Sequence, residues 1–176
     1  MTHAMPPILE TNRLILRAPS AVDLDGYIAF YTSARSSMAG GPVDKRAAWN
    51  ILASDYGHWA MRGFGRFAVV EKSSNRSVGL IGNYQPLGWP EKEIGWVLFT
   101  DAYENHGFAY EATRAVLDHT WSHLKWSTAV SYIDPNNHKS IKLAQRLCAT
   151  LDRDAQIPKP NVPTLVYRHH RTGDAQ

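Results

Sequence analysis

The chain has 176 residues, of which 44% are hydrophobic and 20% charged, a mixture typical of a folded domain and unlike disordered segments. Its net charge of +3 is spread without a run of like charge, so nucleic acid is not indicated as a partner. The single cysteine, Cys148, excludes an intramolecular disulfide and CxxC-type metal sites. No stretch approaches the ~20 apolar residues that span a bilayer. We expect one cytoplasmic domain over residues 1–176, with a leader at 1–8 and a frayed tail at 172–176.

Two helices separate the first expected strand from the others. Alternating apolar residues predict a strand at residues 12–17. Ser20 and Asp23 have the spacing of a helix cap, and apolar residues then recur at helical spacing. From Asp44 onward, apolar residues recur at helical spacing, so a second helix is expected there until Gly63 and Gly65 stop it.

Period-two alternation then predicts an antiparallel meander of three strands, at residues 66–72, 77–84 and 91–99. The remaining elements are expected as a helix at 107–124, a strand at 128–133, a helix at 137–148, and short strands near 150–153 and 165–170. This order indicates an α+β fold with one parallel strand-helix-strand crossover late in the chain.

The turn at residues 104–109 is the most informative segment. A helix N-terminus leaves four backbone N–H groups unpaired and carries partial positive charge, so a thin turn there can bind a pyrophosphate. Gly107 has no Cβ, and Ala109 keeps the first turn of the helix thin. Taken alone, Gly-x-Ala at a helix start is more often plain helix entry. The turn consists of Glu104, Asn105, His106, Gly107, Phe108 and Ala109.

Four segments in order carry a resemblance to a known family, at residues 9–17, 93–98, 107–112 and 137–141. Together they resemble the GNAT acetyltransferase superfamily, in its branch related to ribosomal-protein N-terminal acetyltransferases. The resemblance implies a mostly antiparallel mixed sheet of about seven strands with four helices, splayed between the fourth and fifth strands.

The same resemblance implies that acetyl-CoA binds at this splay. The family's phosphate turn, Q/R-x-x-G-x-G/A, matches Glu104, Gly107 and Ala109, and Glu104 departs from it. Because a carboxylate facing phosphate would repel it, we expect the Glu104 side chain to turn to solvent, leaving its backbone to bind. The backbone groups expected to bind the pantetheine arm are those of Val97, Leu98 and Phe99.

Three residues are candidates for roles near the thioester. Asn137 is expected to contact pantetheine, to cap its helix, or to do both. Glu93 is the candidate general base, acting through water, and its alternative is a surface carboxylate like Glu91. Ser140 is the candidate donor to the leaving sulfur, because Ala144 replaces the family's tyrosine; its alternative is a local backbone partner.

Other residues complete the expectations. Cys148 follows the last helix and is expected to be a buried structural thiol. His119 and His123 have i, i+4 spacing without a third ligand, so we expect an exposed helix face and no metal site. The aromatic residues that can wall an acceptor pocket are Tyr27, Tyr31, Trp59 and Trp89.

The resemblance implies transfer of an acetyl group to a primary amine by direct attack in a ternary complex. As the acceptor, we expect a protein N-terminal α-amine in preference to a small-molecule amine. The alternative is a non-catalytic acyl-CoA-binding or sensing module, because Ala144 and Glu104 depart from the family pattern. Neither nucleic acid nor membrane is expected as a partner, and the sequence leaves the acceptor, the acyl chain and the oligomeric state, including a homodimer, open.

Overall fold

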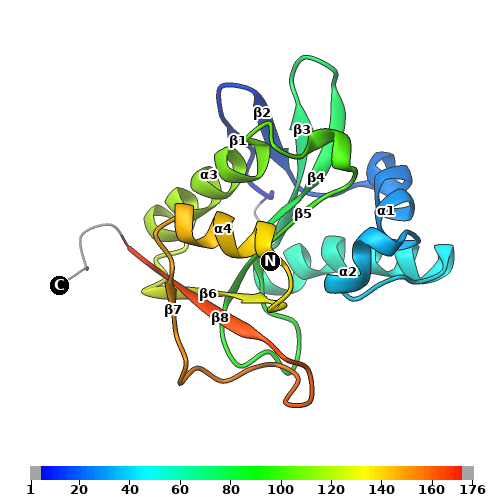
Figure 1. Ribbon diagram of the computed structural model, residues 1–176. Helices are drawn as coiled ribbons and strands as arrows, with labels where there is room; N and C mark the ends of the chain where they lie inside the picture. Colours follow the sequence, from blue (N-terminus) through cyan, green and yellow to red (C-terminus); the bar gives the residue numbers. More distant parts are fainter. Residues whose placement is uncertain (1–4, 172–176) are drawn as a thin grey trace.

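A computed structural model describes residues 5–171 of the chain. The expected tail at 172–176 and the first four residues of the expected leader lie outside the described residues. An 8-stranded sheet forms the centre, and helices cover both of its faces (Figure 1). No helix among residues 5–171 combines the length and the apolar character needed to cross a membrane.

The elements follow the order expected from the sequence. The strands are β1 (Leu9–Glu10), β2 (Leu14–Arg17), β3 (Arg66–Glu71), β4 (Arg76–Tyr84), β5 (Glu93–Leu98), β6 (Thr128–Ile133), β7 (Thr150–Leu151) and β8 (Leu165–His170). The α-helices are α1 (Leu24–Tyr31), α2 (Lys45–Arg62), α3 (Phe108–Ser122) and α4 (His138–Arg146). Short 3₁₀ turns are η1 (Ala21–Asp23), η2 (Ala34–Met38) and η3 (Asp101–Tyr103).

The sheet runs in the order β1-β2-β3-β4-β5-β6-β8-β7, and every neighbouring pair except β5 and β6 is antiparallel. The α+β class and the late parallel crossover are therefore confirmed. The sheet has one strand more than expected, because the two residues of β1 pair with β2 through Leu9 and Leu16. A strand of two residues is too short to show an alternating pattern.

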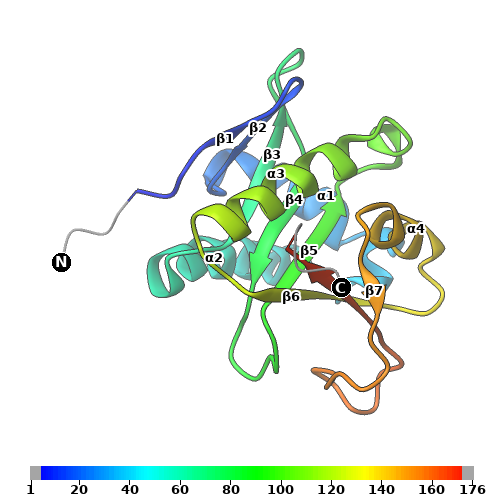
Figure 2. The ribbon, with the colours of Figure 1, turned by 90° about the vertical axis from the view of Figure 1, so that its left-hand side faces the viewer.

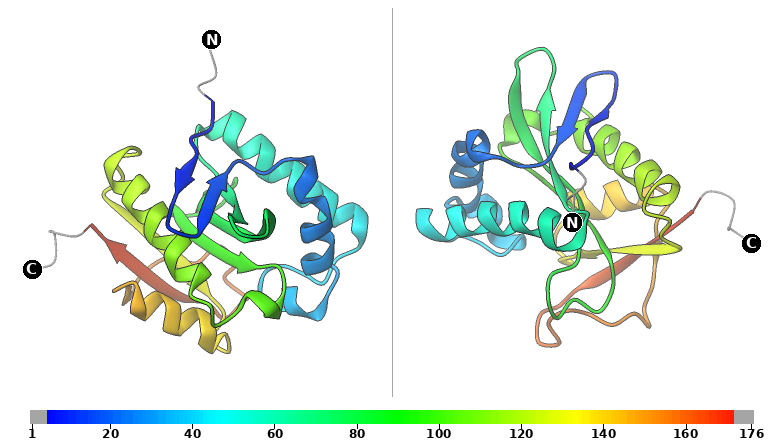
Figure 3. Two further views of the ribbon diagram at one scale, coloured as in Figure 1. Left: turned by 90° about the horizontal axis from the view of Figure 1, so that it is seen from above. Right: turned by 180° about the vertical axis from the view of Figure 1, so that it is seen from behind.

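The helices form two layers, with α1 and α2 on one face of the sheet and α3 and α4 on the other (Figure 3, left). Alternation along β5 accounts for this arrangement. Phe99 and Val97 pack into the apolar cluster of α1 and α2 around Tyr27. Ile94 and Trp96 point the opposite way, into the cluster that includes the apolar side of α3.

Hydrogen bonds and backbone conformation define the helix boundaries. The Asp44 carboxylate accepts a hydrogen bond from the Ala47 N–H at 2.7 Å, which caps the start of α2. Gly63 ends α2 in the left-handed region with φ +73°. At η1, the Ser20 N–H donates to the Asp23 carboxylate at 2.8 Å.

The sheet opens between β5 and β6, as expected from the resemblance. These strands share a single register pair, Glu93 with Val130, and then diverge toward α4 (Figure 2). At the point of divergence the Ser131 hydroxyl donates to the Ile94 carbonyl at 2.6 Å. Beyond this point, backbone N–H and C=O groups on the β6 side of β5 have no partner in β6. The candidate functional site lies in this opening.

Candidate functional site

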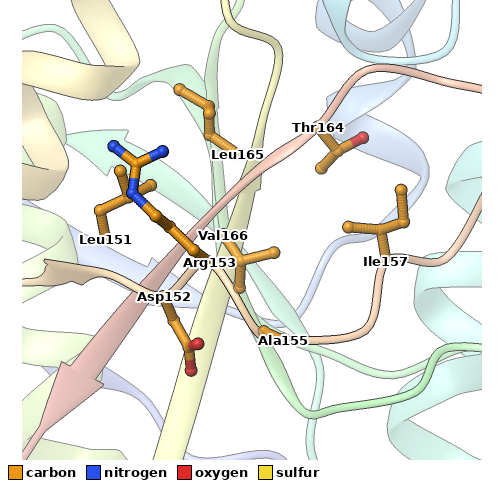
Figure 4. A pocket seen from close by; sticks show the side chains of 8 residues that line it. All are labelled: Leu151, Asp152, Arg153, Ala155, Ile157, Thr164, Leu165 and Val166. Carbon is orange, nitrogen blue, oxygen red and sulfur yellow. The ribbon is translucent and has the colours of Figure 1, made fainter.

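A cleft of about 1150 Å³ passes through this opening in the sheet. It is lined by β5, the turn before α3, the start of α4, η2 and the loop around Trp89. A second hollow, of about 330 Å³, lies between residues 151–157 and 164–166. There the side chains of Asp152 and Arg153 point in different directions (Figure 4). Asp152 accepts a hydrogen bond from Arg168 Nε at 2.7 Å. The large cleft holds most of the residues predicted from the sequence.

The turn before α3 has the backbone geometry of an anion site. Gly107 caps the helix with φ +80°, and the Glu111 N–H makes the first helical bond, to the Gly107 carbonyl at 3.0 Å. Within residues 5–171, no acceptor is bonded to the N–H groups of Phe108, Ala109 or Tyr110. Phe108, Ala109 and Tyr110 all line the cleft, so these main-chain donors lie at its wall.

Arg13 holds this turn in place. Its Nη1 donates to the His106 carbonyl at 2.9 Å, and its guanidinium lies 4.6 Å from the centre of the Phe108 ring. The His106 ring stacks on the Phe108 ring, and His106 does not line the cleft. Arg13 had no predicted role, although it lies in the first segment that carries the family resemblance.

The β5 ladder determines which backbone groups face the cleft. The Phe99 N–H donates to the Val78 carbonyl at 3.0 Å, toward β4. Since bonded and non-bonded pairs alternate in an antiparallel ladder, the Val97 backbone also faces β4. The backbones of Trp96 and Leu98 therefore face the opening. Of the three residues predicted to bind the pantetheine arm, Val97 and Phe99 therefore face β4 instead of the opening. Leu98 remains a candidate, and Trp96 becomes one.

Glu104 does not turn to solvent, and that expectation was wrong. Only 18% of its side chain is exposed. Its Oε1 accepts from Arg35 Nη2 at 2.8 Å, and its Oε2 is paired with the Lys139 ammonium. Burial would raise the pKa of Glu104, but the hydrogen bonds from Lys139 and Arg35 outweigh it and hold the pKa of this carboxyl below its usual range.

The start of α4 contributes two predicted residues to the cleft, Asn137 and Ser140. Asn137 caps the helix, since its side-chain oxygen accepts from the Ser140 N–H at 3.1 Å. The Ser140 Oγ accepts from the Trp96 Nε1–H at 3.0 Å. Because a hydroxyl has one hydrogen and two lone pairs, this contact leaves the hydroxyl hydrogen free to donate. Ala144 is fully buried and offers no acid.

Glu93 differs from its neighbour Glu91. Both Glu91 oxygens pair with Arg168, at 2.8 and 2.9 Å, so Glu91 has a structural role. Glu93 lines the cleft, and its Oε2 accepts from the Trp89 Nε1–H at 2.6 Å. Burial raises the pKa of Glu93 to about 7, against the lowering effects of the Trp89 hydrogen bond and of Arg66. A carboxyl with this pKa exchanges protons near neutral pH.

Aromatic side chains wall the cleft around Glu93. Tyr31 and Trp89 line it as expected, and Tyr84 of β4 joins them. The Trp89 ring lies edge-on to Tyr84, with centroids 5.9 Å apart. Tyr27 and Trp59, also expected in the wall, are buried in the apolar core instead.

A buried ion pair supports this wall. Arg66 lines the cleft, and its Nε and Nη2 donate to the Asp55 carboxylate at 3.0 and 2.8 Å. Tyr27 also donates to Asp55, at 2.9 Å. The guanidinium lies 4.6 Å from the centre of the Tyr84 ring. Because Asp55 balances the charge of Arg66, the carboxyl of Glu93 determines the net charge of this end of the cleft.

Two expectations outside the cleft were wrong. Cys148 is exposed, because it follows α4 with φ +63° while Leu147 and Ala149 take the buried positions. His119 is buried, and only His123 of that pair is exposed. Their rings stack with centroids 4.9 Å apart.

Solved structures resemble the whole chain. An acetyltransferase from Agrobacterium tumefaciens str. C58 is 35% identical, with a TM-score of 0.88, over 97% of this chain and 98% of that chain. A ribosomal-protein-S5-alanine acetyltransferase from Vibrio fischeri shares the fold, with a TM-score of 0.70 at 13% identity, over 93% of this chain and 96% of that one.

Curated relatives match part of the chain. The uncharacterized N-acetyltransferase YnaD of Bacillus subtilis (strain 168) is 28% identical over 82 residues, which are 47% of this chain and 48% of YnaD. The protein YkkB of the same organism is 33% identical over 75 residues, or 43% of this chain and 42% of YkkB. The matched part thus spans about half the length of these relatives.

The family described as acetyltransferase (GNAT) domain matches residues 13–149. The match runs from Arg13, which holds the turn before α3, to Ala149, just beyond the end of α4, and it includes Glu93, Gly107 and Ser140. It covers more than half of the chain. The chain therefore belongs to the GNAT acetyltransferase family.

Proposed function

We propose that the protein transfers an acetyl group from acetyl-CoA to a primary amine. The observation that carries this proposal is the single cleft through the opening between β5 and β6. Glu93, on the α1 and α2 side, and Ser140, on the α3 and α4 side, both line it. A base and a hydrogen-bond donor thus approach one space from opposite faces of the sheet.

The residues of the cleft fit acetyl-CoA. The free N–H groups of Phe108, Ala109 and Tyr110 suit a pyrophosphate at the start of α3. Backbone groups of Trp96 and Leu98 face the opening and suit the amides of a pantetheine arm. When bound, acetyl-CoA supplies an acetyl thioester that an amine can attack.

Glu93 removes the proton of the acceptor amine in this proposal. Its Oε2 accepts from Trp89, and within residues 5–171 no donor is bonded to Oε1, so Oε1 is the oxygen available to the amine. With a pKa of about 7, the carboxyl is substantially ionised at neutral pH. An α-amine with a pKa of about 7.7–8.0 is already partly neutral there, whereas a lysine with a pKa of about 10.4 is not. The base therefore favours acceptors of low pKa.

Ser140 donates to the leaving sulfur. Its Oγ accepts from Trp96, so its hydroxyl hydrogen points away from that contact and is available for donation. The Asn137 cap orders the backbone that carries Ser140. Because a thiol with a pKa near 8.5 is a good leaving group, a hydroxyl donor at this position is sufficient.

We propose a protein N-terminal α-amine as the acceptor, ahead of a small-molecule amine. Aromatic walls at Tyr31, Tyr84 and Trp89 suit an amine that carries apolar groups. The Vibrio fischeri neighbour is named for a ribosomal-protein alanine, which agrees with this order. We place the reaction in the reducing cytoplasm, where an exposed thiol such as Cys148 stays unpaired.

Two measurements test this function. Acetyl-CoA at 100 times its dissociation constant should stabilise the protein by about 2.7 kcal/mol. Release of CoA thiol is then measured with a panel of N-terminal peptides and small amines. Binding without release above the uncatalysed rate would assign the alternative, a non-catalytic acyl-CoA-binding or sensing module. No stabilisation at millimolar acetyl-CoA would contradict both.

A further inference from the structure

A bridge of charges connects three separate elements at the phosphate end of the cleft. Glu104 lies in the turn before α3, Arg35 in η2, and Lys139 in the first turn of α4. Arg35 reaches Glu104 Oε1 at 2.8 Å, and Lys139 pairs with Oε2. All three side chains line the cleft, so the bridge of charges lies across the cleft.

The carboxylate of Glu104 has the surroundings that an anionic ligand would need. It lies three residues before Gly107, beside a helix start with free N–H groups. Two cations contact its two oxygens. Guanidinium and ammonium groups at the N-terminus of a helix are common partners of phosphate. Glu104 therefore occupies a position with the donors of a phosphate site.

We propose that Arg35 and Lys139 bind a phosphate of the cofactor, and that Glu104 holds that place until the cofactor exchanges with it. The inference rests on the proposed function, because it assumes a CoA thioester in the cleft. It gives Glu104 a role as an internal competitor, where the family pattern has Gln or Arg. The phosphate turn then needs no cation of its own, since Arg35 and Lys139 supply two.

The exchange is favourable on charge. The pyrophosphate placed at the start of α3 carries about two negative charges, one on each phosphate, whereas a carboxylate carries one. The bridge is also accessible, because 32% of the Arg35 side chain and 75% of the Lys139 side chain are exposed. Solvent weakens such pairs, so a more highly charged anion displaces Glu104.

A further contact connects the bridge to the pantetheine end of the site. Arg35 Nη2 also donates to the Leu98 carbonyl at 3.3 Å. This carbonyl faces the opening between β5 and β6, where an amide of the pantetheine arm would bind. Movement of Arg35 onto phosphate frees the Leu98 carbonyl, so the two parts of the cofactor site become available together.

The test compares the dissociation constants of CoA and S-acetylpantetheine, which lacks the nucleotide phosphates, by titration calorimetry on the full chain. Glu104→Gln should bind CoA about fivefold more tightly than wild type, because the competitor is gone. Arg35→Gln and Lys139→Gln should each bind CoA several-fold more weakly. Glu104→Gln should leave the affinity for S-acetylpantetheine unchanged.

Asp118→Asn is the matched control, since it changes net charge equally on an exposed side chain of α3 outside the cleft. It should leave CoA affinity unchanged. Equal or weaker CoA binding by Glu104→Gln, or equal tightening by Asp118→Asn, would overturn the exchange. A wild-type protein that binds neither CoA nor acetyl-CoA contradicts the proposed function instead, so the two failures are distinguishable.

Discussion

Arg13 and Glu111 are 98 residues apart in sequence, and the Nε of Arg13 donates to Oε2 of Glu111 at 2.7 Å. The Arg13 N–H and the Thr11 hydroxyl donate to Oε1 of the same carboxylate, at 3.0 and 2.6 Å. Two of the segments that carry the family resemblance thus form one contact. This contact connects the segment that contains β1 and β2 to the first turn of α3, and so it holds the turn at residues 104–109 in place.

Arg13→Lys tests this tie. Lysine keeps the charge, but it lacks the guanidinium group that binds Glu111 and the His106 carbonyl at the same time. The turn at residues 104–109 should therefore be held less firmly. We expect acetyl-CoA affinity to fall several-fold, while unfolding free energy changes by less than about 1 kcal/mol because the ion pair is exposed. Arg114→Lys, on the outer side of α3, is the control and should leave both quantities unchanged. Wild-type affinity in Arg13→Lys would remove Arg13 from the site.

Gly107→Ala tests the turn itself. With φ +80° any side chain is strained, although a Cβ would meet only the Arg13 guanidinium at an ordinary 3.5 Å. We expect a loss of about 1–2 kcal/mol of stability and a weaker affinity for acetyl-CoA. Gly63→Ala has a similar φ of +73° and open space around it, far from the turn. It should lose similar stability and keep wild-type affinity; an equal loss of affinity in both variants would place the pyrophosphate elsewhere.

The raised pKa of Glu93 predicts a dependence of stability on pH. Below pH 4.5 the carboxyl is protonated in both the folded and the unfolded chain, and between pH 4.5 and about 7 the folded chain binds more protons. The contribution of Glu93 is therefore full at low pH and is lost as pH rises toward 7, by up to about 3 kcal/mol. Denaturant unfolding of wild type and Glu93→Gln at several pH values should show curves that diverge over this range. Parallel curves would contradict the raised pKa.

The same group predicts the pH dependence of the rate. For an α-amine acceptor, kcat/KM should rise through pH 7 as Glu93 ionises, and Glu93→Gln should lose about 100-fold at pH 7. Trp89→Phe removes a hydrogen bond that lowers the pKa of Glu93, so its rising limb should shift to higher pH. Trp49→Phe, an exposed tryptophan of α2, should keep the wild-type profile. Identical profiles in wild type and Glu93→Gln would exclude Glu93 as the base.

Trp96 and Ser140 form a pair whose loss should appear in kcat. Ser140→Ala removes the hydroxyl but keeps the N–H that Asn137 accepts from, so the helix start is preserved. We expect about a tenfold lower kcat with an unchanged dissociation constant for acetyl-CoA. Trp96→Phe keeps a ring and loses the donor to Ser140, so it should lower kcat less. An unchanged kcat in Ser140→Ala would leave Ser140 with a structural role only.

Local chemistry accounts for the parts of the fold that could be predicted from the sequence. Alternation along 93–98 and the helix stop at Gly63 are visible in neighbouring residues, and both agree with the structure. The environment of Glu104 depends on Arg35 and Lys139, which are 69 and 35 residues away. No local pattern could indicate that two cations meet that carboxylate, so its direction was predicted wrongly.

Burial at helix surfaces was equally hard to predict. His119 lies on the side of α3 that faces the sheet, where its ring contacts Phe67. Its burial depends on how α3 packs, which the spacing of residues in the sequence does not reveal. Cys148 is exposed because the chain turns at φ +63° directly after α4. The role of Arg13 was missed because its partner, Glu111, is in a distant segment. Each of these depends on contacts between elements.

We propose that acetyl transfer takes place in the cleft between β5 and β6. The most direct test incubates the protein with acetyl-CoA carrying an isotopically labelled acetyl group and with a panel of N-terminal peptides and small amines, and follows the label by mass spectrometry. We predict label on the amine of at least one acceptor, with the rate reduced in Glu93→Gln. If acetyl-CoA binds while no acceptor gains label above the uncatalysed rate, the protein is not an acetyltransferase for these amines and the proposed reaction is wrong.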